Sequence, residues 1–398
     1  MKTILIRNVF FKERHVDILI SGNRFSHISP AGEVSYEADE VIDGEGYAIV
    51  PPFYNMHTHA AMTLLRGYAD DMPLKTWLED YIWPYEATLT PDDIRKGTEI
   101  AIREMIKSGT VFFSDMYFEI PETIDVVNRM GVRAAIGVTF MDNHAKAVRN
   151  EKTRFIEEWK DPSGGRICLT AAPHAIYTVS AEGLKYSFGL ARKHGLKIHM
   201  HLSETLGEVE QCIKEHGMRP VHYLDSLGLL GPDVILAHCV HVDDSEIAVL
   251  AKHDVTVVHC PCSNMKLGSG IFPYRKMIEA GVRVTLGTDG ASSNNNLDMG
   301  EEMKFAALLS KTLGDVECLP ADMAFKWATR NGAMGFGNDG GIIEEGRLAD
   351  CLLIDTSEER MQPLHHFMAN WVYSADSSCI DTVICDGRIL MRGRKLLV

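Results

Sequence analysis

Two pairs of histidines, each with one residue between its members, are candidate metal ligands. His57 and His59 end one strand-like run, and His199 and His201 lie in another. Because alternate side chains of a strand point to the same side, each pair directs two imidazoles one way. Neutral imidazoles suit a borderline cation such as zinc. One pair alone more commonly represents two core or surface histidines, so a metal site needs further ligands.

Further reactive groups lie at the ends of later strand-like runs. His201 is expected as a third ligand, whereas His199 lies deeper and is expected to support another group or to pack. Glu204 follows that strand and is placed to carry a proton, His238 ends the next strand, and Asp289 adds a carboxylate at the last one. Each residue alone has an ordinary structural explanation. Together, at successive strand ends, they predict one active site.

This set of groups predicts hydrolysis at a carbon atom of an aromatic ring. Three histidines and one aspartate around a divalent ion, expected to be zinc, leave room for a water whose pKa falls from about 15.7 to roughly 7. Asp289 can take the proton of that water, and His238 can hold the resulting hydroxide. Glu204 can protonate the ring nitrogen beside the attacked carbon. An acid in that place stabilises the transition state more than the ground state.

The elements that must position these groups alternate between strand-like and helix-like segments, which favours parallel βα units. Helical segments are expected at 92–107, 181–194 and 245–253. Eight strands are expected, namely one ending near His57 and those at 111–113, 134–140, 167–172, 198–202, 234–238, 255–260 and 282–289. The pattern predicts an α/β fold, a (β/α)8 TIM-type barrel, with the reactive groups at the carboxyl ends of its strands.

The two ends of the chain have a different texture, with short strands and tight turns. Residues 1–50 and 346–398 are expected to form one small β-sandwich, and residues 51–345 the catalytic barrel. A glycine-rich stretch from Gly335 to Gly346 is the expected return linker.

The composition is that of a globular protein, with 398 residues of which 45% are hydrophobic and 24% are charged. Lys and Arg number 40 against 55 Asp and Glu, a net charge of −15, which disfavours binding to nucleic acid. No signal peptide or apolar run of membrane-spanning length is recognised, so no membrane partner and a cytoplasmic location are expected. The nine cysteines are expected to be reduced, and Cys260 and Cys262 to pack rather than bind metal.

Several long segments resemble the amidohydrolase superfamily, and within it the branch of S-adenosylhomocysteine and 5′-methylthioadenosine deaminases that is grouped with triazine hydrolases. The similarity runs nearly end to end and is far more specific than a single histidine pair. Its densest segments are 55–67, 77–79, 83–84, 259–261, 263–267, 288–290 and 294–298.

The resemblance implies a role for each site residue. It implies that His57, His59, His201 and Asp289 hold the metal, while Glu204 and His238 act on substrate and water.

The resemblance also implies three substrate-binding residues. Glu86 matches a glutamate that binds ribose hydroxyls, His174 matches a substrate-binding histidine, and Trp77 lies in a shared motif. The alternative for Glu86 is a solvated carboxylate before the next helix, for which Thr90 is a candidate N-cap.

Two departures from related patterns refine the prediction. Two-metal relatives on this fold carry a carboxylated lysine at the end of the fourth strand, where this chain has 172–175 without a lysine, so one metal is expected. Relatives that take S-adenosylhomocysteine often carry arginines after the third strand, and residues 137–140 contain none. Arg149 or Arg154 from the following loop is the candidate substitute for binding a substrate carboxylate.

The expected function is therefore metal-dependent hydrolytic deamination of an adenosine-like amino-purine nucleoside. Alternatives are a guanine, pterin or cytosine deaminase, a triazine chlorohydrolase, and, from a different class, a non-catalytic barrel that serves as a scaffold. Iron or manganese in place of zinc, and a homo-oligomer, also stay open.

Overall fold

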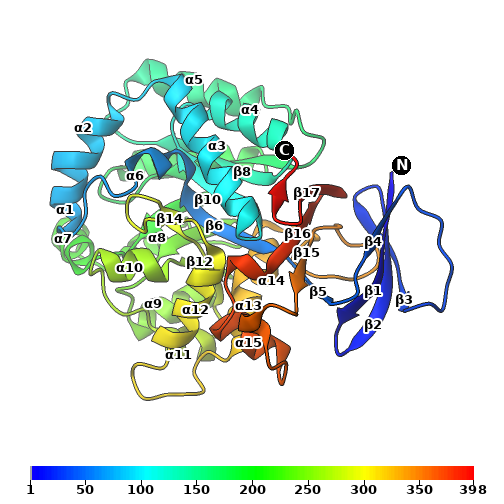
Figure 1. Cartoon of the computed structure of the whole chain (residues 1–398). Helices are drawn as coiled ribbons and strands as arrows, with labels where there is room; N and C mark the ends of the chain where they lie inside the picture. The colour runs from blue at the N-terminus through cyan, green and yellow to red at the C-terminus, as the bar shows by residue number, and fades with distance from the viewer. Residues whose placement is uncertain (1) are drawn as a thin grey trace.

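The computed structural model describes residues 2–398, which form two sheets and their surrounding helices (Figure 1). The larger unit has parallel strands whose order in the sheet follows the chain. These strands are β6 (Phe53–His59), β7 (Thr110–Tyr117), β8 (Arg133–Phe140), β9 (Ile167–Pro173), β10 (Lys197–Leu202), β11 (Val234–His238), β12 (Thr256–His259), β13 (Arg283–Leu286) and β14 (Asp289–Gly290). All eight predicted strands are present, the last one divided into β13 and β14, so the predicted barrel is confirmed.

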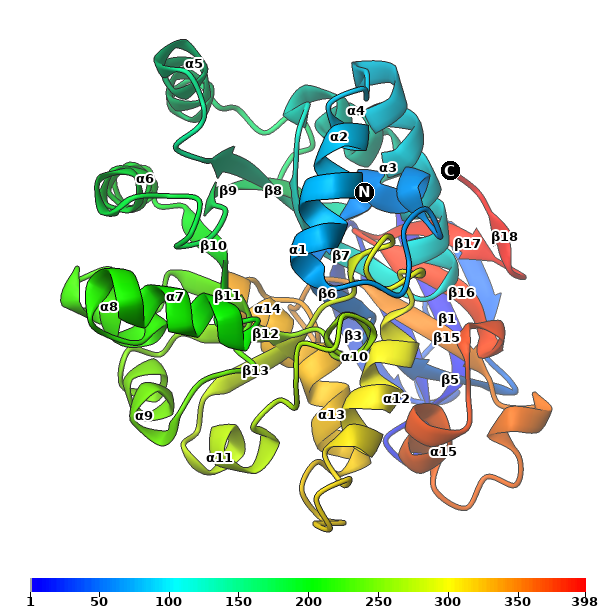
Figure 2. The same cartoon turned by 90° about the vertical axis from the view of Figure 1, so that its left-hand side faces the viewer.

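Helices surround these strands, as Figure 2 shows most clearly. They are α3 (Pro91–Lys107), α4 (Ile120–Met130), α5 (Lys146–Glu157), α6 (Ala181–Lys193), α7 (Leu206–His216), α8 (Pro220–Ser226), α9 (Asp244–Lys252), α10 (Pro261–Lys266), α11 (Tyr274–Glu279), α12 (Met299–Leu309), α13 (Ala321–Ala328) and α14 (Arg330–Phe336). The three predicted helices correspond to α3, α6 and α9. Thr90 is the N-cap of α3, in a reciprocal capping box with Asp93.

The last strand closes the sheet against the first. Asp289 pairs with Thr58, and Gly290 pairs with His59. A Cβ atom at Gly287 would lie only 2.8 Å from both the backbone N and O of His57. Only glycine allows this approach, which brings Asp289 and the two histidines of β6 into one place.

Substituting Gly287 by alanine is expected to destabilise the protein by about 1–3 kcal/mol, since the added methyl group must push β6 and the last strand apart. Gly189 in α6 is a matched control because a Cβ there meets no atom within 4 Å. Gly189→Ala should be neutral or stabilising by about 0.4–1 kcal/mol. Denaturant unfolding of both variants measures the difference, and equal stabilities would contradict the steric argument.

The connection after β6 does not pass directly to its helix but first crosses the carboxyl ends of the strands. It comprises η1 (Ala60–Leu65), α1 (Leu74–Thr76), η2 (Trp77–Ile82) and α2 (Trp83–Glu86). Buried apolar residues of this segment, including Leu65, Trp77 and Ile82, pack with Ile94 of α3 and Tyr117 of β7. In Figure 2, α1 and α2 lie over β6 and β7.

Both ends of the chain contribute to the second sheet, as the sequence predicts. Its strands are β1 (Thr3–Phe11), β2 (Arg14–Ser21), β3 (Arg24–Pro30), β4 (Glu40–Asp43), β5 (Tyr47–Val50), β15 (Cys351–Asp355), β16 (Ile380–Cys385), β17 (Arg388–Arg392) and β18 (Lys395–Leu396), with η3 (Glu359–Met361), α15 (Phe367–Tyr373) and η4 (Ser377–Cys379) between them. They are hydrogen-bonded in one mixed sheet, in which β5 joins the N-terminal strands to β15. The domain boundaries themselves stay a prediction.

A buried ion pair fixes the terminal sheet to the barrel. At the start of β8, Nε of Arg133 lies 2.8 Å from a carboxylate oxygen of Asp350, and Nη2 lies 2.7 Å from one of Asp386.

Among the described residues, every helix is too short or too polar to span a membrane. The nine cysteines are unpaired, and Cys260 and Cys262 are buried outside any group of candidate metal ligands in residues 2–398.

Candidate active site

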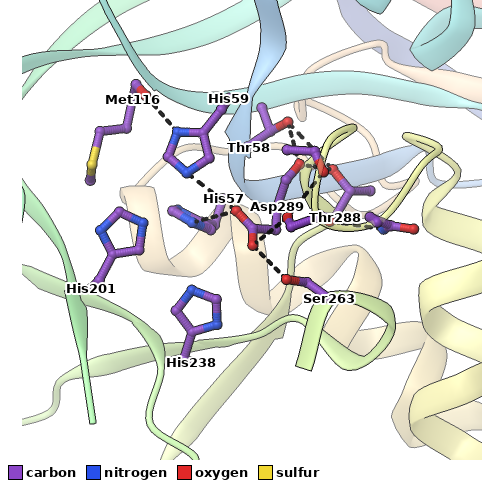
Figure 3. Close-up of polar contacts among 12 residues, drawn as sticks. His57, Thr58, His59, Met116, His201, His238, Ser263, Thr288 and Asp289 are labelled. Carbon is purple, nitrogen blue, oxygen red and sulfur yellow. Dashed lines mark hydrogen bonds and ion pairs between the residues drawn. The ribbon is translucent and has the colours of Figure 1, made fainter. Parts of the chain in front are cut away.

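Four imidazoles and one carboxylate converge at the carboxyl ends of the strands (Figure 3). The ring of His57 lies 4.7 Å from that of His201 and 5.5 Å from that of His238, measured between centroids. One Asp289 oxygen lies 3.3 Å from Nε2 of His57 and 3.2 Å from Nε2 of His59. Strands β6, β10, β11 and β14 each supply part of this cluster, so residues far apart in sequence meet.

The inner nitrogens of two imidazoles point toward the cluster because their outer nitrogens are engaged. Nδ1 of His59 lies 2.6 Å from the carbonyl oxygen of Met116, and Nδ1 of His201 lies 2.9 Å from that of His174. A carbonyl only accepts, so each Nδ1 carries a proton, and Nε2 presents a lone pair whenever the ring is neutral. This is the tautomer that a metal-binding histidine needs.

His199 plays for His57 the part that a carbonyl oxygen plays for His59 and His201, because it engages Nδ1 of His57. Nδ1 of His57 lies 3.0 Å from Nε2 of His199, whose own Nδ1 lies 3.0 Å from the Ser114 hydroxyl. If each Nδ1 donates, His57 keeps a lone pair on Nε2. That atom is buried and accepts no hydrogen bond among the described residues, and the Asp289 oxygen 3.3 Å away cannot donate to it. An unpartnered buried nitrogen is costly unless a ligand engages it, so the residues fit a cation.

Burial keeps two of these histidines neutral. It lowers the pKa of His57 to about 4 and holds the pKa of His201 well below its usual range. For His59, burial opposes protonation, but the hydrogen bond to Asp289 raises the pKa to about 9. Burial also pushes the pKa of Asp289 upward, yet its two imidazole contacts hold it well below the usual range. A bound cation would displace the proton held between His59 and Asp289.

Hydrogen bonds hold Asp289 in place, and its backbone is in a strained conformation. Its other oxygen accepts from the hydroxyls of Ser263 at 2.6 Å and Ser293 at 2.8 Å. Its φ is +62°, in the left-handed region that side-chain-bearing residues seldom adopt. Ser203 (+52°) and His238 (+74°) share this conformation. Strained residues at three strand ends are typical of a functional site, and nothing in the local sequence reveals them.

Glu204 lies beside the cluster, 3.8 Å from Nε2 of His238. Burial raises the pKa of its carboxyl, which favours the protonated form that a proton donor requires. Glu208, which the sequence analysis does not single out, accepts from the backbone N–H groups of Ser203 and Glu204, both at 2.9 Å. It thereby fixes the turn that carries Glu204. Nothing in the local sequence distinguishes Glu208 from the other glutamates of α7 (Leu206–His216).

A cavity opens from this cluster, and most of the predicted substrate-binding residues line it. Its lining includes His59, Met62, Leu74, Trp77, Leu78, Trp83, Glu86, Met116, Tyr117, Phe118, Thr139, Met141, His174, Tyr177, His201, Glu204, His238, Leu267 and Asp289. Within residues 2–398, the buried Trp77 Nε1 and Glu86 Oε1 have no hydrogen-bond partner. Burial raises the pKa of Glu86 and lowers that of His174 to about 3. One oxygen of Glu86 is therefore shielded from solvent, although the residue as a whole is half-buried.

The structure does not bring Arg149 into this cavity. Its guanidinium lies over the ring of Tyr186, 5.8 Å from the ring centroid, and Arg154 lies near Glu158 on the exposed side of α5. The physical reason is that α5 turns this face toward α6 and solvent. The cationic side chain that contacts the end of the third barrel strand, β8, is Lys152 rather than an arginine. Its Nζ lies 2.7 Å from the carbonyl oxygen of Thr139 and also contacts Nδ1 of His144.

Comparison with known proteins identifies the family. A model of the amidohydrolase family matches residues 48–390. The chain is 44% identical to the 5-methylthioadenosine/S-adenosylhomocysteine deaminase of Pelotomaculum thermopropionicum, over 96% of this chain and 90% of that protein. It is 46% identical to the 5′-deoxyadenosine deaminase of Methanothermobacter thermautotrophicus, over 97% and 91% of the two chains.

A solved structure agrees with this assignment. The adenosine deaminase from Xanthomonas campestris with bound zinc superposes with a TM-score of 0.94 at 33% sequence identity, covering 99% of this chain and 94% of that one. With a matching family model over most of its length and relatives of this similarity, the chain belongs to the amidohydrolase family.

Proposed function

We propose that the protein is a metal-dependent hydrolytic deaminase that replaces the exocyclic amino group of an adenosine-like nucleoside by oxygen and releases ammonia. The observation that carries this proposal is a pair of candidate metal-ligand groups that share His57: one adds His201 and His238, and the other adds His59 and Asp289. The four residues other than His57 line the inner end of a cavity. The deaminase names of relatives at 44% and 46% identity support the reaction and the class of substrate.

Each residue of the site has a separate role in the proposed reaction, and the contacts described above support these roles. His57, His59, His201 and Asp289 would hold one divalent ion, for which zinc fits the three imidazoles and one carboxylate. Such an ion supplies hydroxide at neutral pH. Asp289 accepts the proton of the attacking water, and His238 orients that water through Nε2. Glu204 donates a proton to the ring nitrogen beside the attacked carbon. The proton taken up by Asp289 passes to the exocyclic amino group, which leaves as ammonia, and Glu204 recovers a proton from the new hydroxyl group as that group becomes the carbonyl.

The outer part of the cavity suits the sugar and a small apolar 5′ substituent. The unpartnered Glu86 oxygen is an acceptor for ribose hydroxyls, and Trp77 offers an indole N–H. An adjoining hollow continues past Trp83 and Met141, among others, to Glu119 and His144. Burial lowers the pKa of His144 to about 4, so it is neutral. Among the described residues, neither hollow is lined by lysine or arginine.

A nucleoside panel tests the proposal. Ammonia release from 5′-deoxyadenosine, 5′-methylthioadenosine, adenosine and S-adenosylhomocysteine is measured under identical conditions. A carboxylate tail without a cationic partner forgoes a hydrogen bond worth about 1.5–3 kcal/mol. We therefore expect kcat/KM for S-adenosylhomocysteine to be at least about tenfold below that for 5′-deoxyadenosine. Met141→Arg should reduce this difference in kcat/KM, because it adds a guanidinium to the lining of the cavity.

Two outcomes would contradict this proposal at different levels. Turnover of no adenosine derivative, with turnover of guanine, a pterin or a triazine, would replace the substrate class while keeping the metal site. Equal kcat/KM for all four nucleosides would refute only the preference for an apolar substituent.

We also propose a cytoplasmic location, since nine unpaired cysteines are stable as thiols in a reducing compartment.

A further inference from the structure

We infer that Asn264, held in turn by His259 and Tyr274, determines which ring nitrogen of His238 carries the proton. In the favoured state Nδ1 of His238 is protonated, and Nε2 is left as an acceptor facing the cluster. The consequence for catalysis rests on the proposed function, whereas the tautomer itself does not. Asn264, His259 and Tyr274 are positioning residues, because they act through His238.

The four side chains form a continuous buried chain of polar contacts. Nδ1 of His238 lies 2.9 Å from Oδ1 of Asn264, on α10. Nδ2 of Asn264 lies 3.4 Å from Nδ1 of His259, at the end of β12. Nε2 of His259 lies 2.7 Å from the hydroxyl of Tyr274, the first residue of α11. No more than 4% of any of these residues is exposed, so water does not compete for the contacts.

The chemistry of these groups allows the chain only two directions. In one, His238 Nδ1–H donates to Asn264 Oδ1, Asn264 Nδ2–H donates to His259 Nδ1, and His259 Nε2–H donates to the Tyr274 oxygen. In the other, every donor and acceptor is exchanged and the Asn264 amide is turned over. Burial lowers the pKa of His259 to about 3, so it is neutral and carries one proton. Both of its nitrogens therefore cannot donate at once.

The cluster selects the first direction. The second direction would point an N–H of His238 at the place where a cation would bind and where Nε2 of His201 presents a lone pair. The first direction instead gives His238 the same tautomer as His59 and His201, whose Nδ1 atoms face carbonyl oxygens. Asn264 is the counterpart of those carbonyls, and its own orientation is secured by His259.

Two substitutions at Asn264 separate this role from a general structural one. Asn264→Asp keeps an oxygen that accepts from His238 Nδ1, whereas Asn264→Leu keeps the approximate volume and removes the acceptor. We expect the leucine variant to lose about 10- to 100-fold in kcat, the loss typical when a site histidine loses its outer hydrogen-bond partner, with KM within about threefold. The aspartate variant should recover most of that loss. Met265→Leu, an exposed position on the same helix, serves as the control.

A spectroscopic measurement reads the tautomer without any substrate. Nitrogen NMR of the zinc-loaded protein with 15N-labelled histidine rings, the His238 signal being identified by its loss in His238→Asn, distinguishes Nδ1–H from Nε2–H. The wild type and Asn264→Asp should show Nδ1–H at His238, and Asn264→Leu should show a mixture. Should Asn264→Leu fail to fold, Tyr274→Phe removes only the terminal hydroxyl and is expected to shift the tautomer in the same sense.

Two results would overturn the inference. One is an Nε2–H tautomer at His238 in the wild type. The other is an unchanged kcat and an unchanged His238 signal in both Asn264→Leu and Tyr274→Phe. An inactive enzyme on every nucleoside with the expected tautomer would instead refute the proposed function and leave the inference standing.

Discussion

Replacing His201 by alanine is expected to remove both the bound metal and the activity. His201 is the only cluster member that β10 supplies, and its Nδ1 contact with the His174 carbonyl keeps Nε2 directed at the shared centre. Without that ligand the ion is held by two imidazoles and one carboxylate of β6 and β14. We expect activity to fall by at least about 10³-fold, because water without the ion ionises near pKa 15.7 instead of about 7.

The measurement pairs metal analysis with kinetics on the same preparations. Zinc per chain is determined after dialysis for the wild type, His201→Ala and His222→Ala. His222 is a surface histidine whose ring contacts Ser245, so its substitution controls for the loss of an imidazole as such. A His201→Ala protein that retains one zinc per chain would show that another residue is the third ligand. Full activity with no metal would exclude the proposed hydrolytic chemistry.

Glu204→Gln is expected to lower kcat by about 10² to 10⁴ while leaving the metal content intact. Glutamine has the shape of glutamate but cannot release a proton to the ring nitrogen. The turn that carries residue 204 is held through its backbone by Glu208, so the substitution leaves that support in place. Burial raises the pKa of Glu204, which means that a larger fraction of the wild-type carboxyl is protonated near neutral pH.

Glu215→Gln, an exposed change on the same helix as Glu208, is the matched control and should leave kcat unaltered. Single-turnover kinetics with 5′-deoxyadenosine separates the chemical step from product release. An unchanged chemical rate in Glu204→Gln would remove this residue from the mechanism. A loss of zinc together with activity would assign it to the metal site instead.

The segments of regular structure were predictable because they depend on short-range patterns. Alternating apolar runs and amphipathic stretches give the eight strands and the helices α3, α6 and α9. The same two-residue period puts His57 and His59 on one side of β6. Since parallel strands of a barrel end at one face, the shared location of His201, His238 and Asp289 also follows from the pattern.

The supports of the site were not predictable in this way. Glu208, Asn264 and the serines that contact Asp289 have side chains that are common on helices and loops, and only the contacts assign them a role. For Arg149 the sequence suggested a role that the structure does not support. Because Arg149 follows the third strand, it was a candidate for binding a substrate carboxylate, but α5 directs its guanidinium over the ring of Tyr186.

What the sequence by itself determined is therefore the set of elements and the types of reactive group at their ends, because both follow from local periodicity and from strand direction. What only the tertiary structure decided is the distances and hydrogen-bond partners within the site. The approach of Gly287 to His57, the position of Glu86 in a cavity and the polar chain from His238 to Tyr274 each join separate elements of the fold. Such contacts depend on how whole elements pack, and no short window of sequence encodes them.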